Sequence, residues 1–428
     1  MSEENPCASI VLPVHDHLEL TRTCVRALIE HTPEEFELIV VDNGSTDDFR
    51  SWVSALRAEG QAVVYLRNER NEGFGFASNQ GIAAALGEWI VLINNDVIVT
   101  EGWLTRLLAL ARSGDDIAMV GPRTNRASGP QVLPEAAYDD LDGLAAFARR
   151  HAREHAGEHR FLTRIVALCV LVRRSALFEV GGFDPCFWLG NFEDDDLCLR
   201  LVRRGYRIAV ADDVYVHHFG SATWRRSRID YARLMQENWE WFCHKWNYQG
   251  EMTTPYPALR LAKARAFARE VDYVPFRHEE SFAPEVEPLP LVDARPHRLL
   301  LFADLRDERW REVVRQYCLA FGSEDPTTLI VRMEPPSQSV VTRLSARLEE
   351  TLARIGLAGD GGPDILVEQS ELPPHSRGAL YRAAGTLLLA GSPRDGLYAR
   401  EALSCGLPMV NSPSAALLRD LPACAARK

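Results

Sequence analysis

The first half of the chain alternates short apolar runs with segments in which apolar residues recur every three or four positions. Uninterrupted runs of Val, Ile and Leu are typical of parallel strands covered on both faces, and the second pattern is typical of amphipathic helices. The pattern predicts strands at Ser9–Val14, Glu37–Val41, Val63–Leu66 and Trp89–Ile93, and helices at Leu18–His31, Asp48–Glu59 and Phe76–Leu86. We therefore expect an α/β fold with a mostly parallel sheet and helices on both of its faces.

A second alternation of strands and helices follows a Pro-rich, acidic stretch, and 428 residues suit two domains. Its predicted strands are Arg298–Ala303, Thr328–Val331, Ile365–Glu368 and Thr386–Leu389, with helices ending at Phe321 and covering Val341–Ile355 and Arg377–Ala384. The predicted boundaries are 1–245 for the first domain, 246–296 for a linker with one helix at Leu259–Val271, and 297–428 for a smaller, Rossmann-like α/β domain.

Composition narrows the class of protein. A formal net charge of −12 opposes general nucleic-acid binding, although Arg225, Arg226 and Arg228 form either a local basic patch or a solvated helix start. The nine cysteines include no C-x-x-C pair, which argues against a zinc ribbon or a redox couple and fits thiols in a reducing compartment. The N-terminus lacks a signal-peptide pattern and no stretch has the length of a membrane span, so we expect a cytoplasmic protein; peripheral membrane contact and oligomeric state stay open.

Polar residues end or follow two of the predicted strands. FELIVVDNG carries Asp42, and WIVLINNDVIV carries Asn94, Asn95 and Asp96. The carboxyl ends of parallel strands open into the crevice where ligands bind, and a carboxylate there can hold a nucleotide or a divalent ion. The alternative is that these residues form turns or cap helices.

A glycine-rich segment, NEGFGFASNQGI, covers residues 71–82 and passes from a loop into a helix. Gly73 and Gly75 allow the backbone to approach a ligand closely, and free amides at a helix start suit an anionic diphosphate. An ordinary strand-to-helix turn is the alternative.

Four acids, Glu193, Asp194, Asp195 and Asp196, stand at an apparent helix start beside an aromatic run at 188–192. Acids at this position also stabilise a helix through its dipole, so capping is the alternative to a catalytic role. Four of them beside aromatic residues exceed the needs of a cap, and a carboxylate in a partly apolar cleft can deprotonate a sugar hydroxyl.

Two adjacent histidines, His217 and His218, lie at the end of a further strand in VYVHHFGSATW. Adjacent residues on a strand face opposite ways, so we expect at most one imidazole to point into a site. That imidazole could complete a metal shell with Asp96, and a packed structural histidine is the alternative.

In this order the motifs resemble family 2 glycosyltransferases of the GT-A fold, particularly the rhamnosyltransferase-like members, from Ser9 to about Trp224. The resemblance implies nucleoside contacts from the first strand end and Asp42, a donor loop, a metal motif, an E-D pair that contains the base, and a late metal-binding histidine. By this resemblance, Pro13, Val14 and Asp42 would contact the nucleoside, Asn71, Gly73 and Asn79 would belong to the donor loop, and Asn94, Asn95 and Asp96 would form the metal motif. Glu193 and Asp194 would form the E-D pair, with Asp194 as base, and His217 or His218 would be the late metal-binding histidine. The chain departs from the family at Asn94, where the first carboxylate of the metal motif stands, and at His15, where a tyrosine is usual.

The resemblance implies a metal-dependent, inverting glycosyltransferase of the hexosyltransferase kind that uses Mg²⁺ or Mn²⁺. It would move a sugar from a UDP- or dTDP-sugar to a hydroxyl of a saccharide or lipid-linked saccharide acceptor, in the synthesis of bacterial surface polysaccharides or glycoconjugates. We expect Asp96, the acids from Glu193 onward and one of the two histidines to surround one cleft.

The second domain resembles the carboxyl-terminal half of a GT-B, family 4 transferase. Asp395 and Gly396 stand near that family's Glu-Gly pair, and Glu401 stands in its later Glu-Ala pair. The two acids are closer in sequence than in the family, and the amino-terminal partner half is missing. We therefore expect a degenerate or truncated module that serves acceptor binding or assembly.

Two other functions fit parts of the pattern. A nucleotidyltransferase shares the sheet and the carboxylates, but it needs a Gly-rich loop with Arg and Lys after the first strand, and VLPVHDHLEL has none. A catalytically weak, sugar-nucleotide-binding scaffold is favoured only by Asn94.

Overall fold

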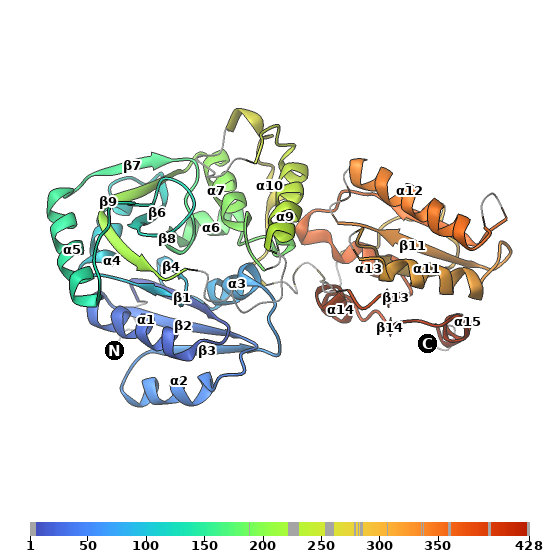
Figure 1. The fold of residues 1–428 in the computed structure, drawn as a ribbon, viewed down its shortest axis with the longest axis horizontal. Helices are drawn as coiled ribbons and strands as arrows, with labels where there is room; N and C mark the ends of the chain where they lie inside the picture. Colours follow the sequence, from blue (N-terminus) through green and yellow to red (C-terminus); the bar gives the residue numbers. More distant parts are fainter. Residues whose placement is uncertain are drawn as a thin grey trace. The chain divides into compact units, whose positions relative to one another are not determined.

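Figure 1 shows the chain as a computed structural model, which describes residues 6–425 except 188, 221–230, 253–260, 278–279, 281, 283–285, 306, 335, 337, 358–360 and 393–394. The chain divides into two compact units, residues 1–277 and 278–428.

The first four strands of the first unit are parallel, as the apolar runs predicted. They are β1 (Ala8–Val14), β2 (Phe36–Asn43), β3 (Val63–Asn68) and β4 (Trp89–Ile93), in the order β3-β2-β1-β4. The helices between them are α1 (Leu18–His31), α2 (Phe49–Ala58) and α3 (Phe74–Ala84). Val14 pairs with Asp42, so the ends of β1 and β2 lie side by side.

The sheet continues through strands of mixed direction. They are β8 (Cys169–Arg173), β6 (Ile117–Thr124), β9 (Arg207–His218), β5 (Val97–Ile98) and β7 (His159–Leu162). β8 is antiparallel to both β4 and β6, whereas β9 is parallel to β6 and antiparallel to β5 and β7. The short β5 comes directly after Asp96 and pairs with the end of β9, so Val97 lies opposite His218. This pairing brings two predicted site segments together that are far apart in the sequence.

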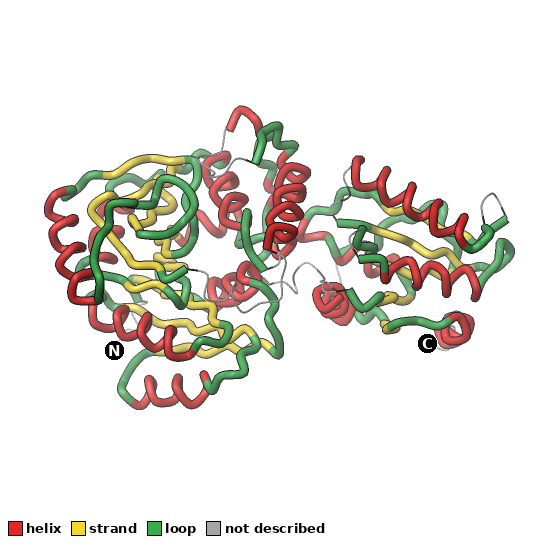
Figure 2. The backbone as a smooth tube through the Cα atoms, in the orientation of Figure 1, coloured by secondary structure: helices red, strands yellow, loops and turns green. Residues whose placement is uncertain are grey.

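Helices cover both faces of this sheet (Figure 2). The remaining helices of the first unit are α4 (Trp103–Arg112), α5 (Leu141–Glu154), α6 (Arg174–Val180), α7 (Glu193–Arg203), α9 (Tyr231–Trp246) and α10 (Arg269–Asp272), with short 3₁₀ turns η1 (Pro185–Phe187) and η2 (Leu261–Lys263). Alternate residues of β1 enter different cores, Ile10 and Leu12 on one face and Val11 on the other. A sheet buried on both faces explains why the strands read as continuous apolar runs.

The helix predicted at Leu259–Val271 is wrong. Among the described residues of that stretch, only η2 and the start of α10 are helical, and residues 265–268 are extended or irregular. The backbone here bonds to the end of α9: Gln249 N donates to Lys263 O, and Arg265 N donates to Trp246 O. These groups are therefore not available for a continuous helix, and residues 261–277 belong to the first compact unit.

The second unit holds an all-parallel sheet of five strands in the order β12-β11-β10-β13-β14. The strands are β10 (His297–Phe302), β11 (Thr327–Arg332), β12 (Asp364–Glu368), β13 (Thr386–Leu389) and β14 (Met409–Asn411). Its helices are α11 (Arg309–Ala320), α12 (Gln338–Arg354), α13 (Gly378–Ala383), α14 (Asp395–Ser404) and α15 (Ala415–Ala425), with the 3₁₀ turn η4 at Pro374–Ser376. The predicted α/β class is confirmed, with a larger sheet rich in parallel strands and a smaller domain built on a parallel sheet.

Across the described part of the chain, no helix combines the length and apolar character needed to cross a bilayer. The eight cysteines from Cys7 to Cys405 are free thiols.

Candidate active site

The carboxylate of Asp42 is fully buried at the end of β2 and holds the following loop in place. Its Oδ1 accepts a hydrogen bond from Ser45 N at 2.9 Å, and its Oδ2 accepts one from the Tyr65 hydroxyl at 2.6 Å and another from Arg67. Its neighbour Val14 is also buried. Asp42 thus shapes the edge of the sheet where the nucleoside was predicted to bind.

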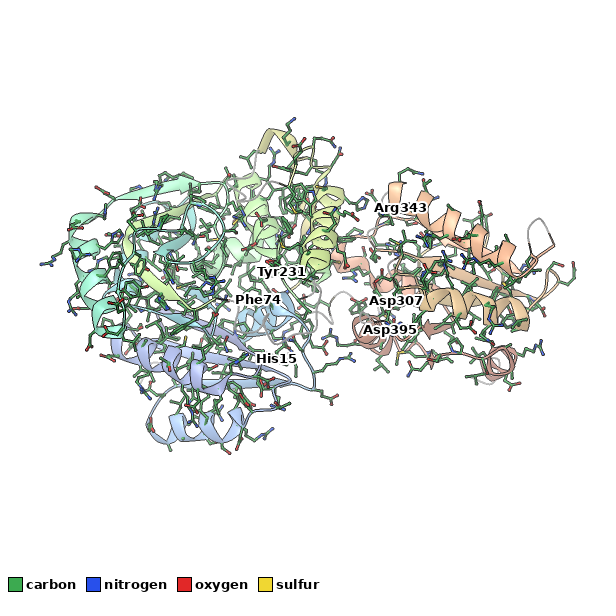
Figure 3. The ribbon with its side chains drawn as sticks, viewed as in Figure 1. His15, Phe74, Tyr231, Asp307, Arg343 and Asp395 are labelled. Carbon is green, nitrogen blue, oxygen red and sulfur yellow. The ribbon has the colours of Figure 1, made fainter. Side chains whose placement is uncertain are left out.

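At the same edge, the loop before α3 is tied to β2 by Asn43. Its Nδ2 donates to Asn71 Oδ1 at 2.9 Å and to Gly73 O at 3.2 Å. Gly73 has a φ of 91°, which glycine adopts most easily, and its N–H donates to Asn71 Oδ1 at 3.0 Å. Asn71 and Gly73 therefore form one turn. Nearby, His15 Nδ1 lies 3.0 Å from Asn43 O (His15 is labelled in Figure 3).

Asn79 lies deeper, on α3, and both polar atoms of its amide are engaged by one residue. Its Nδ2 donates to Phe183 O at 2.7 Å, and its Oδ1 accepts from Phe183 N at 2.7 Å. The side chain is 2% exposed. This geometry favours a structural role, because Asn79 fixes the chain that leads into α7.

The Asn-Asn-Asp motif follows β4 and is anchored from both sides. Asn94 N donates to Leu168 O at 2.9 Å, and Asn95 Nδ2 donates to Thr21 Oγ1 at 2.9 Å. Asp96 Oδ2 accepts from Gly220 N at 3.1 Å, which leaves Oδ1 turned toward His218.

His218 faces Asp96, with 3.2 Å between His218 Nε2 and Asp96 Oδ1. His218 Nδ1 lies 2.7 Å from Arg126 O, a carbonyl that can only accept, so Nδ1 carries a hydrogen. Burial alone would lower the pKa of His218, but the hydrogen bond and negative charge of Asp96 outweigh it and raise the pKa.

These residues fit a divalent ion. A metal-binding imidazole commonly donates its other N–H to a carbonyl or carboxylate, as His218 does to Arg126. Among the described residues no group of three His, Cys, Asp or Glu side chains is placed to hold a metal. An ion held by Asp96 and His218 would therefore take its other ligands from water or from the phosphates of a substrate, as Mg²⁺ commonly does.

His217 turns to the other side of β9, as strand alternation requires. Its Nδ1 lies 2.6 Å from the hydroxyl of Tyr138, which also lies 2.8 Å from the hydroxyl of Tyr215. Burial and the nearby charge of His218 lower the pKa of His217. Of the two adjacent histidines, only His218 contacts Asp96.

The first two acids of α7 are buried but differ in their partners. Asp194 Oδ2 accepts from Ala167 N at 3.3 Å, and its Oδ1 accepts from Asp195 N at 2.8 Å. Glu193 Oε2 is buried with no hydrogen-bond partner among the described residues. Burial and the charge of Asp194 raise the pKa of Glu193 well above its usual value, so Glu193 holds a proton more readily than an ordinary glutamate.

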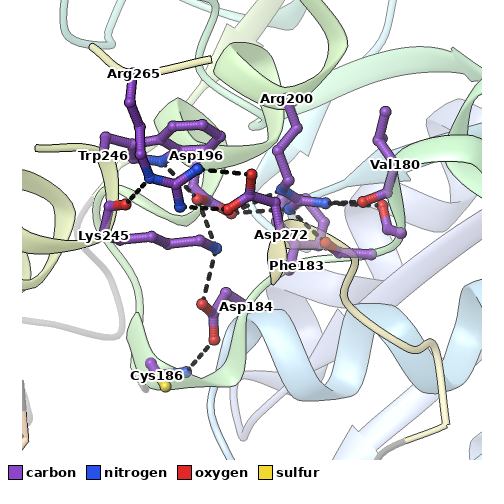
Figure 4. A network of polar contacts seen from close by, with 12 residues as sticks. Val180, Phe183, Asp184, Cys186, Asp196, Arg200, Lys245, Trp246, Arg265 and Asp272 are labelled. Carbon is purple, nitrogen blue, oxygen red and sulfur yellow. Dashed lines mark hydrogen bonds and ion pairs between the residues drawn. The ribbon is translucent and has the colours of Figure 1, made fainter. Parts of the chain in front are cut away.

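The last two acids have other partners. Asp195 accepts a hydrogen bond from the buried Arg164, and burial, partly offset by Arg164, raises the Asp195 pKa to about 7. Asp196 is fully buried with Arg200 and Lys245 (Figure 4). The acidic run that looks uniform in sequence therefore divides into Glu193, whose Oε2 has no hydrogen-bond partner among the described residues, Asp194, which binds Ala167 N, and two acids that pair with cations.

A short path of hydrogen bonds joins the acid pair, Glu193 and Asp194, to the Asn-Asn-Asp motif through Asp194. Asp194 binds Ala167 N, and the next residue, Leu168, accepts from Asn94 N. The residues that sequence patterns did not identify are those that hold this arrangement: Arg126, Arg164 and Ala167. None of them belongs to a recognisable motif, because a backbone carbonyl, a lone arginine and a backbone amide leave no pattern in a sequence.

Several predictions concern other places. The aromatic residue at 188 and the basic cluster Arg225, Arg226 and Arg228 lie outside the described residues. A surface cavity of about 690 Å³ includes Arg123, His151, His155 and Asp212 and none of the predicted site residues.

In the second unit, the two acids of the family 4 resemblance are both engaged. Glu401 is fully buried, pairs with Arg377 at 3.1 Å and accepts from the Tyr381 hydroxyl at 2.6 Å. Asp395 Oδ2 accepts from Gly391 N at 2.6 Å at the start of α14. Figure 3 labels Asp395 together with Asp307, which pairs with Arg309 in the same unit.

Residues 9–178 match the family model described as glycosyl transferase family 2. The chain is similar to an uncharacterized protein of Sinorhizobium fredii, 29% identical over 231 residues that make up 52% of this chain and 25% of that protein. It is similar to the pre-mycofactocin glycosyltransferase of Mycobacterium tuberculosis, 29% identical over 216 residues, 49% of this chain and 42% of that one. An O-antigen biosynthesis protein of Myxococcus xanthus is 26% identical over 242 residues, 53% of this chain and 18% of that one. The chain thus spans less than half the length of each of these three relatives.

Two solved structures are similar at low identity. One is GalNAc-T7 with UDP, GalNAc and Mn²⁺, with 18% identity, a TM-score of 0.46, and coverage of 57% of this chain and 50% of that one. The other is a mannosyltransferase from Pyrobaculum calidifontis in complex with GDP-Man and Mn²⁺, with 17% identity, a TM-score of 0.41, and coverage of 59% and 68%. Both TM-scores are below 0.5.

Proposed function

We propose that the protein is a metal-dependent, inverting glycosyltransferase, from the premise that residues 9–178 match the model of glycosyl transferase family 2. Its donor is a nucleoside diphosphate sugar, of the UDP or dTDP kind. Its acceptor is a hydroxyl group of a saccharide or lipid-linked saccharide.

The observation that carries the proposal is the Asp96–His218 pair. His218 Nδ1 donates its hydrogen to Arg126 O, so Nε2 is the ring nitrogen that faces Asp96, 3.2 Å from its Oδ1. Nε2 can therefore share a proton with Asp96 or bind a metal ion. When bound, Mg²⁺ or Mn²⁺ supplies positive charge that neutralises the departing diphosphate. The turn at Asn71 and Gly73, beside the ends of β1 and β2, supports a donor site at this edge of the sheet.

The proposed base is Asp194. It takes the proton of the acceptor hydroxyl while that oxygen forms a bond to the anomeric carbon. The bond from the anomeric carbon to the diphosphate breaks on the opposite face, and its electron pair leaves with the diphosphate, so the configuration inverts. The hydrogen bonds from Ala167 N and Asp195 N fix the direction of the Asp194 carboxylate.

The names of two relatives guide the choice of acceptor. One is a pre-mycofactocin glycosyltransferase and another is an O-antigen biosynthesis protein. We propose a role in the synthesis of a bacterial surface polysaccharide or glycoconjugate.

Donor hydrolysis tests the function. A panel of nucleoside diphosphate sugars is incubated with the full chain, Mn²⁺ or Mg²⁺, and then with EDTA. Release of nucleoside diphosphate that EDTA abolishes supports the proposal. Release of pyrophosphate from a nucleoside triphosphate and a sugar phosphate would indicate a nucleotidyltransferase, and binding without any turnover would indicate a scaffold.

The base assignment is tested by Asp194→Asn. We expect turnover to fall by about 10² to 10⁴-fold, the usual contribution of a general base. Binding of UDP with Mn²⁺, measured by calorimetry, should change little because Asp96 and His218 are intact. Turnover at the wild-type level would reject this role for Asp194.

A further inference from the structure

Two residues directly before the acid pair have a left-handed backbone. Asn191 has a φ of 75° and Phe192 a φ of 72°, and neither is glycine. Residues held in this conformation persist only where surrounding contacts fix them, and they cluster at functional sites. The contacts that fix these two residues therefore bear on the direction of Glu193 and Asp194.

Asn238 of α9 supplies contacts of this kind. Its side chain is fully buried, and its Nδ2 donates to Phe187 O at 2.8 Å, Gly190 O at 2.8 Å and Asn191 O at 3.1 Å. Three carbonyls of the loop that leads into α7 thus converge on one amide group. The first residue of α9, Tyr231 (labelled in Figure 3), adds a hydrogen bond from its hydroxyl to Asn191 Oδ1 at 2.9 Å.

Lys245, at the other end of α9, holds α7 through Asp196, the fourth residue of α7. Lys245 Nζ lies 2.8 Å from Asp196 Oδ1 and 2.9 Å from Asp184 Oδ2, and its side chain is 7% exposed (Figure 4). Trp246 Nε1 also donates to Asp196 Oδ1 at 2.9 Å. Asp184 and Asp196 are balanced by Lys245 and Arg200, so removing Lys245 leaves a buried negative charge without its partner.

Asp96 and His218 are held by other contacts than the acids of α7. Asp96 and His218 are held by β5, the end of β9 and the Arg126 carbonyl. The hydrogen bonds and ion pairs of Asn238 and Lys245 go to the chain around α7. The contacts that α9 makes around α7 are therefore distinct from those that hold Asp96 and His218.

We infer that Asn238 and Lys245 of α9 are positioning residues: they hold the acid pair of α7, Glu193 and Asp194, in the orientation in which Asp194 can take the acceptor proton. This inference rests on the proposed function. It predicts that a change in α9 lowers turnover without weakening metal-dependent binding of the nucleotide.

The test compares Asn238→Leu and Lys245→Met in the full chain with Gln236→Ala, an exposed position on the same helix that bonds to Glu240. For the two α9 variants we expect turnover to fall by about 10 to 100-fold, since a displacement near 1 Å can cost that much. The dissociation constant for UDP with Mn²⁺ should stay within about twofold of wild type. Lys245→Arg should restore most of the turnover, because it returns a cation to the two carboxylates.

Amide hydrogen exchange gives a readout that does not depend on activity. In the two α9 variants, exchange should accelerate at residues 190–197 and stay unchanged at 92–98 and 214–218. Unchanged turnover, or unchanged exchange at 190–197, would overturn the inference. Equal acceleration in both segments, with nucleotide binding lost, would show that α9 only supports the fold.

These outcomes are distinct from failure of the proposed function. If wild-type protein releases no nucleoside diphosphate from any donor, the proposed function fails. The exchange measurement would then still decide whether α9 holds the α7 loop.

Discussion

At the scale of single residues, the most informative contact is the one between Asp96 and His218. The neighbouring His217 has the same chemistry but contacts Tyr138 instead. The pair of histidines therefore contains its own matched control.

The first prediction concerns metal binding by Asp96 and His218. Asp96→Ala and His218→Gln should each weaken binding of UDP with Mn²⁺ by at least about 10 to 100-fold, since even residues that only orient metal ligands contribute that much. His217→Gln should bind like wild type. Calorimetry with and without Mn²⁺ measures these affinities, and wild-type affinity in His218→Gln would remove His218 from the metal site.

The second prediction concerns the proton on Glu193. In the folded protein its pKa is raised, so the folded state keeps a proton that the unfolded chain releases above about pH 4.3. The free energy of unfolding should therefore fall as the pH rises above that value, because the unfolded state then binds fewer protons. Glu193→Gln removes this effect, so the variant should gain stability over wild type between about pH 5 and 8.

Urea unfolding at several pH values measures this difference, with the exposed Glu30→Gln on α1 as the control. A difference between Glu193→Gln and wild type that does not change with pH would show that Glu193 is ionised in the folded protein.

At the scale of elements, α3 and the chain before α7 are joined by Asn79. The resemblance to family 2 assigns Asn79 to the donor loop, whereas its amide pairs with both backbone groups of Phe183. Gly182 is packed so closely that an added Cβ would lie 2.1 Å from Asn79 Oδ1. This contact is a structural joint between two elements.

The third prediction follows from that joint. Asn79→Ala should lower the free energy of unfolding by about 2 to 4 kcal/mol, because two buried backbone groups lose their partners. Gln80→Ala, at the next position of α3, should cost much less, since the side-chain partner of Gln80 among the described residues is the partly exposed Asn68. If Asn79→Ala weakens UDP binding without loss of stability, the donor role implied by the resemblance is correct.

At the scale of the whole molecule, the end of the first compact unit depends on the chain beyond α9. Arg203 donates to the carbonyls of Leu261 and Ala264, and Gly181 forms a bridge with Val274. Arg265 pairs with the buried Asp272 at 2.6 Å. Residues 261–277 therefore complete the packing around α6 and α7.

The fourth prediction compares two truncations. Residues 1–277 should bind UDP with Mn²⁺ and keep donor hydrolysis, whereas residues 1–245 should be unstable, because Trp246, Tyr248 and the Arg265–Asp272 pair are lost. Thermal unfolding and UDP binding measure both. Equal stability of the two pieces would show that the segment after α9 is dispensable, and hydrolysis by residues 296–428 alone would assign activity to the second domain.

Much of the fold could be predicted from the sequence. Leu18–His31, Trp89–Ile93 and Thr386–Leu389 were predicted with the ends that the structure gives them, because buried strands and amphipathic helices impose a local pattern of apolar residues. The helix at Leu259–Val271 was wrong for the converse reason. Its backbone bonds to the distant end of α9, and a local pattern contains no information about such a partner.

The sequence by itself determined the α/β class, the two sheets and the residue types of the candidate site, since these depend on local periodicity and on motifs that follow strands. Only the tertiary structure decided which of two adjacent histidines meets Asp96, and that three consecutive acids, Asp194, Asp195 and Asp196, meet Ala167, Arg164 and Lys245 respectively. Direction and partners depend on segments that lie tens of residues away in the chain, and only folding brings those segments within hydrogen-bonding distance.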